Sequence, residues 1–178
     1  MNFLTTALFL GLAVQIYGQR LHVKDLHNAL ETSQKIWLAY RSYERFTGIQ
    51  EHKCVSAKKI SLENNKYQFR QEYKIGEETK SHELTGQLAE GQEQDDGPVL
   101  YVTGPDGGMA NYTLRHWDRT NNCGILSLIF NGEKQCELHV WEDDLKKPGE
   151  PYACEIEFKQ HCPHAKQHSV SSSACVHS

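Results

Sequence analysis

The stretch from Asn111 to Trp141 constrains the fold of this chain most strongly, because it predicts three consecutive antiparallel strands. Asn131-Gly132 separates two apolar-rich runs, Cys123–Phe130 and Cys136–Trp141. An Asn-Gly pair readily adopts the positive φ angles of a tight hairpin turn and is therefore a strong short-range hairpin signal. A cysteine begins each run, so the direction in which these two cysteines point also determines where their neighbours point.

The preceding part of the chain predicts five further strands separated by turns. Residues 67–75 alternate apolar and polar side chains with a period of two, which indicates a strand with one buried face. Asn64-Asn65, the run 76–78 and the glycine-rich run 104–108 supply turn chemistry. The other strands are expected at residues 36–45, 53–61, 79–88 and 99–103. Eight strands in meandering order, without βαβ alternation, favour an all-β closed antiparallel barrel that can hold one small ligand.

Two short helices and a targeting segment flank the predicted strands. Residues 23–34 carry apolar side chains at helical spacing, and residues 151–161 form the second predicted helix, since proline suits a first helical turn. Residues 142–150 predict a charged loop. The apolar run 4–16 is too short to cross a bilayer, so residues 1–18 are expected to be a signal peptide and residues 19–178 one secreted domain.

Composition restricts the function classes. Six cysteines behind a secretion signal imply three disulfides, although spacing alone leaves 15 possible pairings. The net charge of −4 argues against nucleic acid or an anionic membrane as partner. Asn111-Tyr112-Thr113 is an acceptor sequence for N-glycosylation.

The sequence lacks the motifs of common catalytic and metal sites. The sequence has no nucleophile elbow, no metalloprotease helix motif and no phosphate-binding loop, so an enzyme is not expected. His161, His164 and His168 surround a cysteine that is expected to be oxidised, and neither a metal nor a cofactor is predicted.

Several motifs together resemble the tick salivary lipocalins, a family that includes the histamine-binding proteins and the Japanin group. These motifs are Cys123-Gly124-Ile125, Glu137-Leu138, Cys154 in a following helix, Ala174-Cys175 and His52-Lys53-Cys54. The resemblance implies a lipocalin barrel with a short amino-terminal helix and a carboxyl-terminal helix packed outside. It also implies the disulfides Cys54–Cys175 and Cys123–Cys154, with Cys136 and Cys162 then expected to pair with each other.

These pairings predict the direction of the side chains. If Cys123 and Cys136 face outward, alternation points the residues next to them into the barrel. A glycan on Asn111 would likewise place Tyr112, Leu114 and His116 inside the barrel. Tyr43 and Tyr101 match tyrosines of the family. The predicted ligand-binding residues are Trp37, Tyr43, Tyr101, Tyr112, Leu114, His116, Leu126, Leu128, Phe130, Glu137, His139 and Trp141.

Departures from the family pattern bear on the ligand. A buried amine needs carboxylates and aromatic faces. Amine-binding members have an acidic residue where this chain has Gly124 and an aromatic residue where it has His139. We therefore predict a salivary, monomeric lipocalin that binds a lipophilic ligand such as a sterol, fatty acid or eicosanoid and modulates host immune or inflammatory responses. Two alternatives are a scavenger of histamine or serotonin, and a filled barrel whose outer surface binds a host immune-cell protein.

Overall fold

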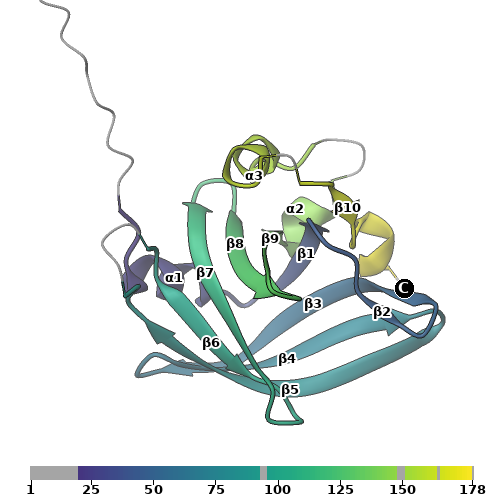
Figure 1. The fold of residues 1–178 in the computed structure, drawn as a ribbon, viewed down its shortest axis with the longest axis horizontal. Helices are drawn as coiled ribbons and strands as arrows, with labels where there is room; N and C mark the ends of the chain where they lie inside the picture. The colour runs from purple at the N-terminus through teal and green to yellow at the C-terminus, as the bar shows by residue number, and fades with distance from the viewer. Residues whose placement is uncertain (1–19, 93–95, 148–150, 164, 178) are drawn as a thin grey trace, which may run out of the picture.

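The computed structural model describes residues 20–92, 96–147, 151–163 and 165–177, so the predicted signal peptide lies outside the described residues. A barrel of strands is flanked by short helices (Figure 1). The elements are α1 (Val23–Leu30), β1 (Lys35–Arg41), β2 (Phe46–Thr47), β3 (Gln50–Glu63), β4 (Lys66–Ile75), β5 (Glu78–Ala89), β6 (Val99–Thr103), β7 (Met109–Asp118), β8 (Cys123–Phe130), β9 (Glu133–Trp141), α2 (Glu142–Leu145), α3 (Glu155–His161), β10 (His168–Ser169) and the 3₁₀ helix Ser173–Val176. In this part of the chain, no helix has the length and apolarity needed to cross a membrane.

The first strand closes the barrel. Strands β3 to β8 each pair antiparallel with the next strand in the sequence. β1 pairs with β9, from Ile36 opposite Trp141 to Arg41 opposite Glu137, and also with β3, where Trp37 lies opposite Ser56. The two-residue strands β2 and β10 only extend the edges, so the closed barrel has eight strands, and the predicted fold class is confirmed.

Two hairpin turns predicted from asparagine chemistry occur where expected. Asn64 and Asn65, between β3 and β4, have φ angles of 49° and 61°. Asn131 and Gly132, between β8 and β9, have φ angles of 53° and 81°. Positive φ at both central residues matches the right-handed twist of the paired strands, which is why these residue types fix the register of the two hairpins.

The outer faces of β1, β8 and β9 form a core with the two later helices. Trp37, Ile125, Leu138 and Phe158 are buried there, together with Leu145 of α2. Two disulfides join the strands of this outer core to α3. Cys123 of β8 bonds to Cys154 at the start of α3, and Cys136 of β9 bonds to Cys162 at its end. Figure 1 shows α3 outside the barrel, beyond β8 and β9. The third disulfide joins Cys54 to Cys175, so the three pairs are those expected.

The amino-terminal helix packs into the barrel rather than on its outer wall. Leu26 is 1% exposed and belongs to a second core with residues of β4, β5, β6 and β7 that point inward. The helix begins at Val23, where Asp25 accepts a hydrogen bond from the His22 amide in a capping box. It ends at Leu30, four residues earlier than predicted.

Among the strands, β1 ends at Arg41 rather than at residue 45, and β3 is longer than the predicted 53–61. Two helical elements also differ from the sequence prediction. The predicted helix 151–161 begins only at Glu155, and Cys154, with φ −89° and ψ 18°, is its N-cap. The predicted loop 142–150 starts with the one-turn helix α2, whose first turn carries Glu142, Asp143 and Asp144. Acidic side chains favour a helix amino terminus, but four residues are too few to show helical periodicity in a sequence.

Candidate functional site

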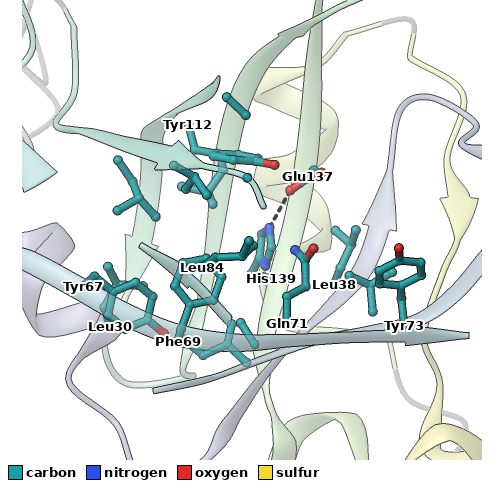
Figure 2. A pocket seen from close by; sticks show the side chains of 18 of the residues that line it. Leu30, Leu38, Tyr67, Phe69, Gln71, Tyr73, Leu84, Tyr112, Glu137 and His139 are labelled. Atoms are coloured by element: carbon teal, nitrogen blue, oxygen red, sulfur yellow. Dashed lines mark hydrogen bonds and ion pairs between the residues drawn. The ribbon is translucent and has the colours of Figure 1, made fainter. Parts of the chain in front are cut away.

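The barrel encloses a cavity of about 550 Å³. That volume lies within the range of sites for small organic ligands. Figure 2 shows side chains from several strands converging on it. Its lining residues include Leu26, Ala29, Leu30, Ile36, Leu38, Arg41, Tyr43, Arg45, His52, Val55, Ala57, Tyr67, Phe69, Gln71, Tyr73, His82, Leu84, Leu100, Val102, Tyr112, Leu114, Trp117, Gly124, Leu126, Glu137, His139 and Trp141.

The two ends of the cavity differ in character. At the closed end, Leu26, Ala29 and Leu30 of α1 cover the interior, and the apolar core of the barrel continues from them. At the other end, which we call the mouth, the lining residues Arg45 and Met109 are exposed to solvent. A ligand therefore meets polar and charged groups near the mouth and apolar side chains at the closed end.

Glu137 is the buried carboxylate of the cavity wall. It is 4% exposed and projects inward from β9. The hydroxyl of Tyr43 donates a hydrogen bond to Oε1 at 2.5 Å, and Oε2 lies 2.8 Å from Nε2 of His139. Burial would raise the pKa of Glu137, but the hydrogen bond and charge of His139, with help from Tyr43 and Arg41, hold that pKa below its ordinary value. Glu137 is therefore a carboxylate whose two oxygens are both occupied.

Two tyrosines beside Glu137, Tyr43 and Tyr112, stay protonated, and Tyr43 is the one that donates a hydrogen bond to the carboxylate. Burial, followed by the negative charge of Glu137, raises the pKa of Tyr43 far above its ordinary value. The pKa of Tyr112 is raised by the same two causes in the same order. Phe130 stacks on the Tyr43 ring with centroids 4.4 Å apart, so it orients that ring and thereby the bond to Glu137.

Arg41 places a buried positive charge near the mouth. Its side chain is 1% exposed, and Nη2 donates to Glu51 Oε1 and to the His52 carbonyl oxygen, each at 3.1 Å. The guanidinium carbon lies 5.4 Å from the centroid of the Tyr43 ring. Its Nε has no hydrogen-bond partner among the described residues. An unpartnered buried donor is costly, so Nε is available to an acceptor atom.

Histidines complete the polar wall near the mouth. The His52 ring stacks on Tyr73 with centroids 4.7 Å apart, and the Tyr73 hydroxyl lies 3.3 Å from Nε2 of His82. Burial, then the charges of Arg45 and Arg41, lowers the pKa of His52, so its ring is neutral at physiological pH.

The closed end holds one polar atom without a partner. The Tyr67 side chain is 1% exposed, and its ring stacks on Phe69 with centroids 4.7 Å apart. No hydrogen-bond partner reaches its hydroxyl oxygen within the described part of the chain. Figure 2 shows Tyr67 with Leu30 and Phe69 on one side of the cavity and Tyr73 on the other.

Most of the residues predicted to contact a ligand converge on the cavity. Gly124 also faces inward on β8, as the alternation required. The predicted residues that line the cavity are Tyr43, Tyr112, Leu114, Leu126, Glu137, His139 and Trp141. Leu128 is buried and Phe130 contacts Tyr43, but neither is a lining residue.

Three predicted residues point away from the cavity. The prediction for His116 is wrong because β7 has a bulge between Leu114 and His116, which reverses the alternation and brings Trp117 inside. His116 instead faces His161 of the outer helix α3, with ring centroids 6.1 Å apart.

The alternation of side chains along a strand explains why Trp37 and Tyr101 also point away from the cavity. Trp37 lies in the outer core, because its neighbours Ile36 and Leu38 line the cavity. Tyr101 lies between Leu100 and Val102, which both point inward, so Tyr101 also belongs to the outer face.

Sequence reasoning missed the lining residues of α1 and β4. The alternation of Tyr67, Phe69, Gln71 and Tyr73 was a signal for one buried face, yet it did not show that this face borders a cavity. The helical spacing of Leu26 and Leu30 was a similar signal. For Arg41 the sequence carried no signal, because an arginine in a strand is ordinarily a surface residue.

The sequence profile of the tick histamine-binding proteins matches residues 19–177. The chain belongs to this family. No curated protein matches it significantly. Among solved structures, it is similar to Japanin from Rhipicephalus appendiculatus bound to cholesterol, with a TM-score of 0.53 and 19% identity over 79% of this chain and 94% of Japanin. It is also similar to AM182 in complex with serotonin, with a TM-score of 0.61 and 14% identity over 84% of this chain and 91% of AM182. At these identities the two structural similarities show a shared fold and do not identify the ligand of this chain.

Proposed function

We propose that this family member is a secreted salivary lipocalin that holds one small lipophilic molecule in its barrel and modulates host immune or inflammatory responses by doing so. The observation that carries the proposal is the composition of the cavity. Its closed end is apolar apart from the Tyr67 hydroxyl, and its one buried carboxylate among the described residues, Glu137, already bonds to Tyr43 and His139. The bound cholesterol of Japanin shows that the same fold accommodates a sterol in another protein.

Lipid binding follows from the burial of apolar surface. A ligand that fills the closed end removes its own apolar surface and that of leucines such as Leu84 and Leu100 from water. One polar group of the ligand would then meet His139 or the free Nε of Arg41 near the mouth. Binding rather than catalysis is the role of this site, and the family is likewise described by what it binds.

A biogenic amine is the second candidate, and Glu137 is the observation that favours it. A buried carboxylate beside Tyr43 and Tyr112 offers a counter-ion and aromatic faces for a small cation. The serotonin complex of AM182 has the same fold. We rank this candidate second because an ammonium group would have to compete with His139 for Glu137, and a small amine would leave most of the apolar closed end empty.

Two measurements on the purified protein test the ranking. Mass spectrometry of a solvent extract should detect a co-purified lipid, and titration calorimetry should find no tight binding of histamine or serotonin. Sub-micromolar amine binding would reverse our ranking. If no lipid is retained or taken up and no amine binds, a surface that binds a host protein becomes the better explanation.

A pair of bulky substitutions on one strand locates the binding site. Leu126→Trp fills the cavity, whereas Ile129→Trp makes the same kind of change on β8 at an exposed position. Lipid retention should be lost in the first variant and kept in the second. Equal retention in both would show that the lipid lies outside the barrel.

Three further proposals concern the mature protein. Asn111 is exposed on β7, as a glycan there would require. We also propose that residues 1–18 are removed during secretion and that the protein is a monomer. Intact-mass analysis of the secreted protein tests the glycan and the removal of residues 1–18, and light scattering tests the monomeric state.

A further inference from the structure

We propose that Tyr67 is a second recognition residue, whose hydroxyl binds an oxygen atom at the end of the ligand that enters the barrel first. The inference rests on the proposed function and narrows it, because the ligand then belongs to the lipids with a polar group at each end. A fatty acid with a hydroxyl near its far end, or a sterol hydroxylated on its side chain, has this chemistry.

The position of Tyr67 supports this role. It is an early residue of β4, paired with Leu62 of β3 and Gly86 of β5, and it lines the cavity at the end that α1 covers. Its stacking on Phe69, with ring planes 15° apart, fixes the direction of the ring. The hydroxyl is thus held in place before a ligand arrives, which limits the entropy lost on binding.

The hydroxyl has the properties of an available donor. Burial, then the negative charge of Glu31, raises the pKa of Tyr67, so the phenol keeps its proton. The Glu31 carboxylate is itself engaged by the Lys59 ammonium group and makes no hydrogen bond with Tyr67. Buried hydroxyls in proteins are nearly always hydrogen-bonded, so an unpartnered one that borders a cavity indicates a partner brought by the cavity's occupant.

The mouth provides the other polar anchor. Arg41, Glu137 and His139 lie on β1 and β9, and in Figure 2 Tyr67 is set apart from the labelled Glu137 and His139. Leu84, Leu100 and Leu114 also line the cavity, and they pack in one core with Leu26 of α1. A ligand that satisfies both anchors is therefore polar at its two ends and apolar between them, in contrast to a lipid with a single head group.

The test compares lipids that differ by one oxygen. Saturated fatty acids from dodecanoic to octadecanoic acid are titrated beside their terminal-hydroxy derivatives, and cholesterol beside a side-chain-hydroxylated derivative. We expect the wild-type protein to bind at least one hydroxylated lipid about three- to tenfold more tightly than its parent.

Two tyrosine variants on β4 identify the group responsible. Tyr67→Phe keeps the ring and its contact with Phe69, and it should remove the preference while the dissociation constant of the parent lipid stays within about twofold. Tyr73→Phe is the matched control, because this lining tyrosine already has His82 as a partner, and it should keep the preference.

The possible results separate the inference from the function. Binding of the parent lipids without preference at any chain length, or a preference that survives in Tyr67→Phe, overturns the role of Tyr67 and leaves the proposed function standing. Failure of every parent and derivative to bind the wild-type protein contradicts the proposed function and this inference together.

Discussion

At the scale of single residues, Glu137 links the stability of the fold to pH. Its pKa in the folded protein lies below the ordinary value, so between that ordinary value, about 4.3, and the lower folded value the unfolded chain binds more protons. The carboxylate therefore stabilises the fold above about pH 4.3, and this contribution is lost as the pH falls through the folded pKa.

We predict that Glu137→Gln lowers the free energy of unfolding at pH 7 by about 3 kcal/mol, because it leaves His139 without its charged partner. The difference from the wild-type protein should shrink as the pH falls below about 4.3, where the unfolded chain takes up its proton before the folded protein does. Urea unfolding at a series of pH values measures it. Glu83→Gln removes an exposed carboxylate paired with Arg70 and should stay within about 0.5 kcal/mol throughout. A constant penalty for Glu137→Gln across that range would contradict the assignment.

The three tryptophans give a second prediction at this scale. Trp117 and Trp141 line the cavity with ring centroids 5.8 Å apart, whereas Trp37 lies in the outer core. Uptake of a lipid should therefore change the fluorescence of the first two only. The change should persist in Trp37→Phe and fall by more than about half in the Trp117→Phe/Trp141→Phe double variant. A signal that depends on Trp37 would mean that the ligand binds outside the barrel.

Single residues also show where prediction from sequence fails. Alternation placed Glu137, His139 and Trp141 correctly toward the interior, because β9 pairs with β8 without interruption from Phe130 to Cys123. It placed His116 wrongly, because one bulge reverses the parity of every residue beyond it. No residue type in the run from Leu114 to Trp117 marks that bulge, so only the three-dimensional pairing reveals it.

At the scale of elements, α1 gives the barrel its closed end. Leu26 is fully packed against inward-pointing residues of the strands, so Leu26→Ala should lower the free energy of unfolding by about 2–4 kcal/mol. Lys24→Ala changes an exposed residue of the same helix and should alter stability by less than about 0.5 kcal/mol. Denaturant titrations compare the two. Similar small losses in both variants would show that the helix contributes little to the barrel's interior.

The predictability of the elements follows from the kind of signal each one carries. β4 was evident from its alternation and the two hairpins from their asparagines, since these are local effects of backbone chemistry. Closure of the barrel depends on β1 pairing with both β9 and β3, which are far apart in the sequence. Such pairing leaves no local pattern, and the expectation of a closed barrel therefore relied on the number of strands and on resemblance to the lipocalins.

At the scale of the whole molecule, the disulfides divide into two kinds. Cys54–Cys175 spans 121 residues and ties β3 to the carboxyl-terminal segment, whereas Cys123–Cys154 and Cys136–Cys162 span 31 and 26 residues and hold the two ends of α3. A cross-link stabilises a protein mainly by restricting the unfolded chain, and the effect grows with the length of the closed loop.

We therefore predict that replacing Cys54 and Cys175 by alanine lowers the free energy of unfolding by about 5 kcal/mol. Each of the two shorter pairs should cost about 3.5 kcal/mol, with nearly equal losses because their loops are nearly equal. Urea unfolding of the three double variants measures the order. The two α3 variants serve as controls for each other, since both remove a buried cystine on the outer core. If either is less stable than the Cys54/Cys175 variant, packing of α3 on β8 and β9, and not closure of the long loop, dominates the stability of the barrel.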